Sequence, residues 1–293
     1  MSISKPANTA ITSRGITHEN THTHPKPTPT LGIVGCGAIG QSILGAVSQG
    51  KLAVSVAGVH TRTPDKAREF LSRLPQPPPL LDLDALISRS SLVVEAAGGP
   101  MVLELARRCF SAGKDLLVIS VGALLEHPEV FEQARTSGCR LILPSGAIAG
   151  IDGVKSACAG RVDRVSVTTR KPPRGLAGAP YLVQHGISLE NLTEETEVFN
   201  GTVREGCRGF PDNVNVTATV SLAGIGPDRT RLRILAVPGQ THNQHTVEVE
   251  GEFGYFSLTI RNVPTENPKT GRLTAMSMIR AIADSMDSVR VGN

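Results

Sequence analysis

Three glycines with the spacing Gly-x-Gly-x-x-Gly could hold a cofactor: Gly35, Gly37 and Gly40. An apolar run at 31–34 leads into them, and an apolar, helix-compatible segment at 41–47 follows. In such a strand–turn–helix unit the first glycine makes the turn, the second lets the backbone approach a pyrophosphate, and the third lets helix and strand pack closely. The N–H groups at the start of the helix then face the phosphates. We therefore predict that a dinucleotide binds at Gly35, Cys36, Gly37, Ala38, Ile39 and Gly40, against the alternative of a plain glycine-rich turn.

The residues that follow the second expected strand, at 54–59, indicate which dinucleotide is bound. In NAD-binding units an acidic residue about 20 positions beyond the glycines binds the ribose 2′-hydroxyl. Here the strand runs into His60, Thr61 and Arg62, with no carboxylate among them. An arginine can pair with a 2′-phosphate, which a carboxylate would repel. We therefore predict that Thr61 and Arg62 bind the cofactor, with NADP favoured or both NAD and NADP accepted. In the alternative, Arg62 is solvated and Asp65 partly takes over the acidic role.

Small residues end the expected parallel strands, and ligands of open α/β sheets bind beyond these carboxyl ends. The ends lie at 96–99, 120–123 and 144–150, and all three are rich in Gly, Ala and Ser. They leave room for a nicotinamide and a small substrate, so we predict cofactor contacts from Ala97 and Gly98. Segment 144–150 also marks the passage into the second half of the chain, and a substrate cleft is expected at this hinge.

The proton donor or acceptor is expected from the second half of the chain. Hydride transfer at a carbon bearing oxygen or nitrogen needs such a group, and histidine is the commonest choice. The candidates are His185, His242 and His245, and each of them could instead be structural. A third metal ligand at convincing spacing from His242 and His245 is missing, so we predict no metal site. Composition and spacing do not choose among the three histidines.

Short apolar strands alternate with helices over 31–150, which is typical of a doubly wound parallel sheet. The expected strands are 31–34, 54–59, 91–97, 116–120 and 140–143, and the expected helices are 41–47, 64–74, 83–88, 101–112 and 129–137. After residue 150 the expected strands, 162–170, 231–237, 245–250 and 255–263, suit an antiparallel sheet with one face available. Helices are expected at 202–210 and 213–223, and a last helix at 273–286. That helix carries an apolar face of Met276, Ile279, Ile282, Ala283 and Met286.

The predicted fold class is therefore α/β, a Rossmann doubly wound parallel sheet plus a smaller α+β domain with a mostly antiparallel sheet. Residues 1–30, rich in Thr, Pro, Ser and His, are expected to form a disordered tail. The dinucleotide-binding domain is expected at 31–150 and the catalytic and substrate domain at 151–270. Residues 271–293 are expected to return as a helix that packs on the first domain.

Composition excludes several classes of partner. The 293 residues carry a formal net charge of +4 with no block of Lys and Arg, and only 3% are aromatic, so we expect no nucleic-acid partner. Apolar runs stay below about 18 residues, so no membrane span is expected. Five scattered cysteines without a CxxC pattern indicate reduced thiols and a cytoplasmic protein. We also expect a homo-oligomer, a dimer.

Six blocks of the sequence, in order, resemble the L-aspartate dehydrogenases, Rossmann-type amino-acid dehydrogenases related in architecture to dihydrodipicolinate reductase and homoserine dehydrogenase. They are 35–40, 94–99, 144–153, 210–216, His245 ahead of 247–254, and 267–270. The Ser-Gly-Ala-Ile-Ala-Gly block at 145–150 and the Asn-Val-Asn-Val block at 213–216 are much more specific than the glycines. The resemblance covers all of the chain except the tail. The sequence departs from it at Thr61 and Arg62, where many members carry Asp.

The resemblance implies a reaction and a set of site residues. Ala149 and Asn215 would contact NAD(P), and His245, rather than His242, would be the catalytic acid/base. L-Aspartate would be oxidised through iminosuccinate to oxaloacetate and ammonia. The substrate is thus a small dicarboxylate amino acid or keto acid, and its two carboxylates need cationic or N–H partners. Arg170, Lys171, Arg174, Lys269 and the neighbourhood of Ser145 are the candidates. The alternatives are an NADP-dependent reductase of another small keto or imino acid, and a non-catalytic NADP(H)-sensing protein.

Overall fold

The computed structural model describes residues 29–263, 271–289 and 291–292. The predicted tail up to residue 28 and the block at 267–270, which includes Lys269, lie outside these ranges. Two five-stranded sheets form the frame of the molecule, one in each half of the chain. Within the described residues, no helix is long and apolar enough to cross a membrane.

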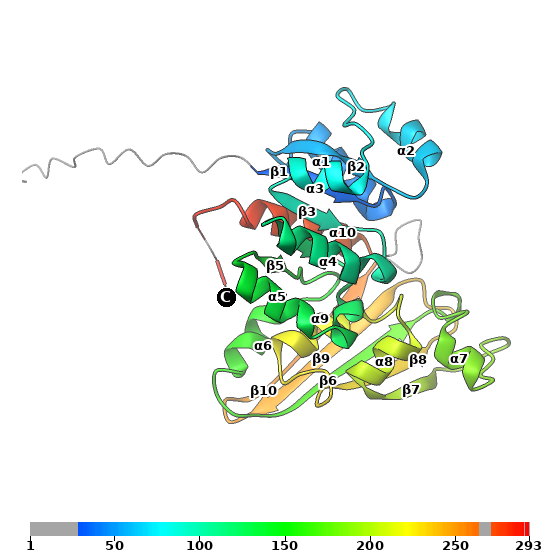
Figure 1. Cartoon of the computed structure of the whole chain (residues 1–293). Coiled ribbons are helices and arrows are strands. Elements are labelled where there is room, and N and C mark those ends of the chain that lie inside the picture. The colour runs from blue at the N-terminus through cyan, green and yellow to red at the C-terminus, as the bar shows by residue number, and fades with distance from the viewer. Residues whose placement is uncertain (1–28, 264–270, 290, 293) are drawn as a thin grey trace, which may run out of the picture.

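The first sheet is parallel throughout and has the strand order β2-β1-β3-β4-β5 (Figure 1). Its strands are β1 (Thr30–Val34), β2 (Ser55–His60), β3 (Leu92–Glu95), β4 (Asp115–Val118) and β5 (Leu141–Ile142). Alternate side chains enter separate cores on the two faces: Val93 packs with one, Leu92 and Val94 with the other. The predicted doubly wound sheet is therefore confirmed.

Helices cover both faces of this sheet. They are α1 (Ala38–Ser48), α2 (Pro64–Leu71), α3 (Leu83–Arg89), α4 (Val102–Ser111) and α5 (Glu129–Ser137), with 3-10 turns η1 (Gly99–Met101) and η2 (Val121–Glu126). The core on one face joins Leu86 of α3 to Leu105 of α4, and the core on the other contains Ile43 of α1. Because β1, β3 and β4 are buried on both faces, their ends alone are left to contact a ligand.

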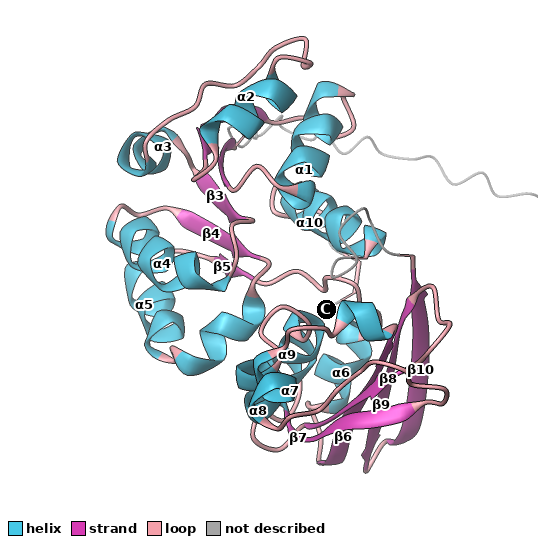
Figure 2. Cartoon of the chain, turned by 90° about the vertical axis from the view of Figure 1, so that its right-hand side faces the viewer, coloured by secondary structure: helices cyan, strands magenta, loops and turns pink. Residues whose placement is uncertain are grey.

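The second sheet has the order β10-β9-β6-β8-β7, antiparallel except for the β6–β8 pair. Its strands are β6 (Val162–Lys171), β7 (Thr196–Thr202), β8 (Arg231–Ala236), β9 (Asn243–Gly251) and β10 (Gly254–Asn262). The helices α6 (Ile151–Ala157), α7 (Pro180–Gln184), α8 (Val203–Gly209) and α9 (Asn215–Ala223) lie on one side of it, toward the first domain (Figure 2). The expected smaller α+β domain is confirmed.

The edge strand β7 and the short helices α6 and α7 were not predicted from the sequence. In β7 the pairing with β8 shifts between Glu197 and Phe199, so Val198 and Phe199 are both buried and the polar–apolar alternation is broken. Thr202 ends this strand as the N-cap of α8, in a capping box with Glu205. The predicted helix at 202–210 therefore begins at Val203.

The C-terminal helix α10 (Arg272–Asp284) packs against α1, and Met278 and Ile282 enter the core that contains Ile43. The predicted apolar face was wrong at Met276, whose side chain is 60% exposed. Helical residues turn by about 100° each, and the buried stripe runs through 275, 278 and 282, which leaves 276 on its flank. Figure 2 shows this helix beside α1, although the two helices lie near opposite ends of the chain.

Candidate functional site

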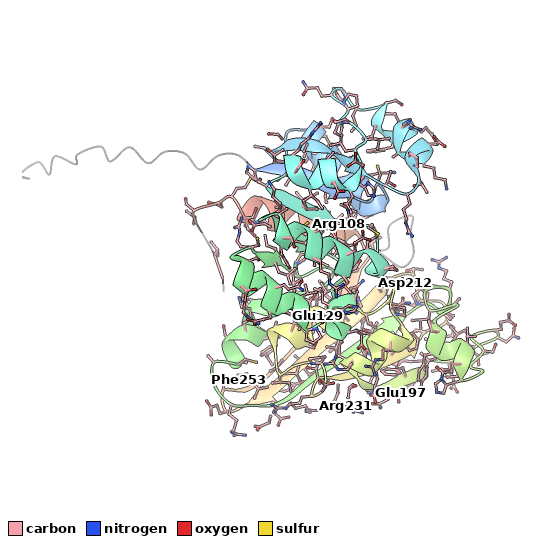
Figure 3. All side chains as sticks on the ribbon, viewed as in Figure 1. Arg108, Glu129, Glu197, Asp212, Arg231 and Phe253 are labelled. Atoms are coloured by element: carbon pink, nitrogen blue, oxygen red, sulfur yellow. The ribbon has the colours of Figure 1, made fainter. Side chains whose placement is uncertain are left out.

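A cavity of about 850 Å³ lies where the strand ends of the first sheet meet the inner face of the second sheet. The first domain lines it with the glycine turn and the loops after β3 and β4, and residues of 144–147 also contribute. The second domain lines it with side chains of β6, β9, β10 and the 207–219 region. Asp212, labelled in Figure 3, lies at the level where the two domains meet. A cavity of this size accommodates a nicotinamide and a small substrate together.

The glycine turn between β1 and α1 has the geometry that a phosphate needs. Gly35 has φ +105°, and a Cβ there would lie 2.2 Å from the carbonyl oxygen of Ala96, so only glycine fits. A Cβ on Gly37 would meet nothing within 4 Å, so the backbone is open on the cavity side. Neither a side-chain cap nor an acidic residue in the first turn competes for the N–H groups of α1. The residues present therefore fit a dinucleotide phosphate at this helix end.

Glu95, at the end of β3, holds the loops on either side of it together. Its side chain is 0% exposed. Oε1 accepts hydrogen bonds from the backbone N–H groups of Ala97 and Gly98, both at 2.8 Å, and from Ser120 Oγ at 3.2 Å. Oε2 accepts from the backbone N–H of Ser120 at 3.0 Å. Glu95 was not predicted as a site residue from the sequence, although it lies in the block at 94–99. The available signal is a carboxylate in an otherwise apolar, buried strand.

The inner face of the second sheet presents a row of buried polar groups to the cavity. His245 on β9 is 3% exposed, and its Nδ1 lies 3.0 Å from Thr169 Oγ1 on the paired strand β6. Lys171, two residues after Thr169 and so on the same face, is 2% exposed. Asn243 on β9 pairs in register with Asn262 on β10, and both are buried and line the cavity. The strand register thus brings a base, a cation and amides to one place.

Of the three candidate histidines, His245 alone lines this cavity. His242 lies at the turn before β9, half-buried and off the cavity wall. His185 is exposed after α7, where its ring stacks on Tyr181. Within the described residues, no group of three His, Cys, Asp or Glu side chains is arranged to hold a metal ion.

Burial, and to a lesser extent the positive charge of Lys171, lowers the pKa of His245 to about 3 from its ordinary 6.5. The imidazole is therefore neutral near pH 7 and able to accept a proton. The Thr169 contact fixes the ring orientation, and the direction of that hydrogen bond sets which ring nitrogen carries the hydrogen. A buried neutral histidine beside a cation is suited to acid–base chemistry next to a bound anion.

The candidate cations for the substrate carboxylates differ in their position relative to the cavity. Lys171 donates a hydrogen bond from Nζ to Asn213 Oδ1 at 2.8 Å and lines the cavity. Arg170 points to the opposite face of the sheet, where it pairs with Glu195 at 3.0 Å. Arg174 is exposed and does not contribute to the cavity wall, and neither does Ser145. Of the three candidate cations among the described residues, Lys171 alone lines the cavity.

Only some of the other predicted cofactor contacts line the cavity. Asn215, at the start of α9, accepts a hydrogen bond from the backbone N–H of Gly122 at 2.9 Å, and so connects the two cavity walls. Gly98 lines the cavity, whereas Ala97 and Ala149 lie just off its wall. Thr61 and Arg62 also lie outside it, but the Gly35 N–H donates to His60 O at 2.8 Å, which places the end of β2 beside the glycine turn.

A cluster of ion pairs fastens the two domains at the rim of the cavity. Glu126, at the end of η2, pairs with Arg208 of α8 at 2.8 Å, and this hydrogen-bonded pair lowers the pKa of Glu126. Arg204 of α8 pairs with Asp228 at 2.6 Å and donates to the carbonyl of Leu125 in η2. The loop after β4 is therefore held against α8 by charged groups as well as by the Asn215 amide.

Each half of the chain matches a model of a known protein family. A family model described as aspartate dehydrogenase, C-terminal, matches residues 152–285, and one described as homoserine dehydrogenase, NAD binding domain, matches residues 35–144. L-Aspartate dehydrogenase 3 of Bordetella bronchiseptica is 39% identical over 263 residues, covering 89% of this chain and 97% of that protein. The L-aspartate dehydrogenase of Methanosarcina mazei is 42% identical over 267 residues, covering 89% and 98%.

Solved structures agree with these sequence matches. The aspartate dehydrogenase of Thermotoga maritima superposes with a TM-score of 0.70 at 26% identity, over 90% of this chain and 99% of that one. A homoserine dehydrogenase of Thiobacillus denitrificans shares the fold, with a TM-score of 0.56 at 14% identity over 89% of this chain and 75% of that one.

Proposed function

The chain belongs to the L-aspartate dehydrogenase family, and from this premise we propose how its own residues carry out the reaction. The protein is an amino-acid dehydrogenase that acts on the CH–NH₂ group of L-aspartate with a nicotinamide cofactor. Oxidation at Cα gives iminosuccinate, and water then releases oxaloacetate and ammonia. The observation that carries the assignment of roles is the buried pair of His245 and Lys171 in a cavity whose opposite wall is the glycine turn.

His245 is the acid/base group of this proposal. The bound nicotinamide supplies the hydride acceptor. Neutral His245 takes the proton that leaves the substrate nitrogen, or that of the water that adds to the imine carbon, and returns it in the reverse direction. In the free protein, the pKa of about 3 keeps the His245 imidazole neutral, so it is in the base form. The positive charge of Lys171 contributes to this low pKa, and an anionic substrate bound beside Lys171 offsets that charge.

Lys171 binds a substrate carboxylate. The Lys171 ammonium is 2% exposed and lines the cavity beside the base, so it can form a charge-assisted hydrogen bond with an anion bound there. Asn213 orients the ammonium through its hydrogen bond, and the amides of Asn243 and Asn262 add hydrogen-bonding groups along the same wall. This arrangement suits a small dicarboxylate better than a monocarboxylate.

NADP is the favoured cofactor in this proposal, with Thr61 and Arg62 at its 2′-phosphate. Asp65, the carboxylate that could have bound a 2′-hydroxyl instead, pairs with Arg68 at 2.5 Å on the exposed side of α2. None of the ion pairs among the described residues involves Arg62, so its guanidinium is available to a phosphate. Ala97 and Ala149 are proposed as further contacts on the strength of the family resemblance.

A homodimer in the cytoplasm completes the proposal. The face of the second sheet that turns away from the helices carries charged side chains of both signs, such as Arg233 paired with Glu197 at 2.6 Å, and Figure 3 shows Glu197 and Arg231 along it. We expect a second copy of the chain to cover this face, and light scattering on the purified protein would show whether the protein is a dimer. All five cysteines are free thiols, as suits a reducing compartment.

The deciding experiment is reduction of NADP⁺ and NAD⁺ by the purified protein with L-aspartate, and with L-asparagine, L-glutamate and L-alanine as controls. Turnover that is strongest with L-aspartate supports the proposal. Turnover with a different small amino acid alone identifies the enzyme as a dehydrogenase of that acid. Cofactor binding without turnover of any substrate indicates the non-catalytic sensor.

A further inference from the structure

Glu95 is a buried carboxylate without a cationic partner. None of the ion pairs among the described residues includes it, and its four hydrogen bonds come from three backbone N–H groups and one hydroxyl. Burying a carboxylate is costly unless hydrogen bonds replace its hydration, and here both oxygens are occupied. Packing alone would be served by an apolar residue in this strand, since Leu92, Val93 and Val94 fill the other positions.

The groups that Glu95 holds belong to the wall of the cavity. Gly98 and Ser120 line it, and they follow β3 and β4 respectively. Ala96 backs directly on the glycine turn, because a Cβ on Gly35 would touch its carbonyl oxygen at 2.2 Å. One carboxylate therefore sets the relative position of the loops after β3 and β4, and through Ala96 their fit against the turn after β1. Gly98 has φ +97°, a backbone conformation that glycine adopts readily because it has no Cβ.

We propose that Glu95 is a positioning residue for the cofactor: it locks the loops after β3 and β4 into one wall, and as an anion without a counter-cation it favours the oxidised cofactor over the reduced one. The inference rests on the proposed nicotinamide cofactor and extends it to a residue that touches neither cofactor nor substrate. The oxidised nicotinamide ring carries a positive charge that the reduced ring lacks. A fixed negative charge buried directly behind the wall stabilises the positive form, because charges interact more strongly in the low local dielectric of the protein interior than in water.

Two substitutions separate the two parts of this role. Glu95→Gln keeps the length of the side chain but removes the charge, and its amide NH₂ faces the Ser120 N–H in place of an acceptor. Glu95→Asp keeps the charge but is one methylene shorter, so it cannot reach both loops. Glu104→Gln on α4 is the matched control, because it removes the same charge from an exposed pair with Arg108 in the same domain.

The measurement is the dissociation constant of oxidised and reduced cofactor by titration calorimetry, without turnover, together with the melting temperature. We expect Glu95→Gln to weaken oxidised cofactor by about tenfold and reduced cofactor clearly less. Glu95→Asp should weaken both forms by similar factors, and Glu104→Gln neither. A Glu95→Gln protein that folds and binds both forms like the wild type would overturn the inference. Equal weakening of both forms by Glu95→Gln would overturn its electrostatic part.

The same design keeps this inference apart from the proposed function. If Glu95→Gln does not fold, Glu95→Asp still tests the link between the two loops, and unchanged affinity in Glu95→Asp would reject that link. A wild-type protein that binds the oxidised and the reduced cofactor but leaves L-aspartate unreacted would refute the proposed function. It would not refute the role of Glu95, because the dissociation constants of the cofactor are measured without substrate.

Discussion

The two walls of the cavity are built from different parts of the polypeptide. The wall from the first domain is formed largely by backbone and small residues, among them Gly37, Gly98 and Gly122, and its ionisable side chains are Glu126 and His127. The wall from the second domain consists of buried side chains, above all Lys171 and His245. In the proposed function, the first wall holds the dinucleotide, which most dehydrogenases share, and the second wall holds the substrate and the acid/base group, which distinguish this reaction.

This difference decides what a substitution can do at each wall. On the first wall a functional group is a peptide N–H, which no side-chain deletion removes, so only an added side chain or a displaced loop can damage it. On the second wall the functional group is the side chain itself. The Asn215–Gly122 hydrogen bond at 2.9 Å connects the walls, so they remain coupled in position although they differ in construction. Deletions in the second wall should therefore affect turnover and leave cofactor binding almost unchanged.

The sharpest test of that separation is His245→Asn. The substitution removes the group that accepts the proton while it leaves a polar side chain in the row, and general acid–base help is typically worth about 10²- to 10⁴-fold. We expect kcat for L-aspartate to fall by a factor in that range. The dissociation constant of NADPH should change by a few-fold at most, because the dinucleotide is held by the opposite wall. Steady-state kinetics and calorimetry measure the two quantities on one preparation.

His242→Asn is the control for this substitution, since His242 lies three residues away and off the cavity wall. It should keep most of the wild-type kcat. A His245→Asn protein that retains most of its turnover, or a crippled His242→Asn protein, would refute the assignment. Loss of cofactor binding in His245→Asn would show that the two walls do not act separately.

A smaller effect is expected from Lys171→Met, which keeps the length of the side chain and removes its charge. Hydrogen bonds to charged groups contribute about 1.5–3 kcal/mol, so KM for L-aspartate should rise by roughly 10- to 100-fold. Arg170→Met is the matched control, because Arg170 faces the other side of the sheet and pairs with Glu195. Equal KM values in the two variants would remove Lys171 from the carboxylate site.

The contrast between the walls also explains how far the sequence could be interpreted. The glycine turn is local: three glycines, a preceding strand and a following helix lie within 31–47, so spacing alone predicts it. The second wall is non-local, because Thr169 meets His245 only through the pairing of β6 with β9. Without that register, His245 could not be distinguished from His242 except by family resemblance. Neither could Lys171 be ranked above Arg170, its neighbour on the opposite face.

Residues whose side chains form hydrogen bonds to distant backbone groups are the hardest to find from the sequence. Glu95 bonds to the loop just after its own strand and also to Ser120, 25 residues on, and no spacing rule contains such a link. The C-terminal helix shows a different limit. Its amphipathic pattern was recognised, but Met276 was assigned to the buried stripe in place of Met278, because apolar residues occur on more than one side of that helix.

The proposed binding of the ribose can be tested at the end of β2, which lies beside the glycine turn of the first wall. Thr61→Asp combined with Arg62→Ala places a carboxylate at the end of β2 and removes the cation there. A carboxylate repels a 2′-phosphate and binds a 2′-hydroxyl, so the ratio of kcat/KM for NADP to that for NAD should fall, by about tenfold. Turnover with saturating NAD should stay near the wild-type value, because the second wall is untouched. An unchanged ratio would mean that the 2′ position is recognised by other residues.

The smallest effect expected concerns acid stability, and it tests whether His245 is as buried as the second wall requires. The folded-state pKa of His245 is about 3 and its ordinary value is 6.5, so between these values the unfolded chain binds a proton that the folded chain does not. Stability therefore rises with pH across this window. The contribution of His245 is fully present above pH 6.5 and is lost as the pH falls toward 3, with a slope of at most about 1.4 kcal/mol per pH unit.

His245→Asn has no such proton to bind, so the free energy of unfolding in urea, measured from about pH 4 to pH 7, should fall less steeply with acid than in the wild type. His242→Asn should follow the wild-type slope. Parallel curves for wild type and His245→Asn would mean that the imidazole titrates alike in the folded and unfolded states, and the neutral base assigned to the second wall would have to be sought elsewhere.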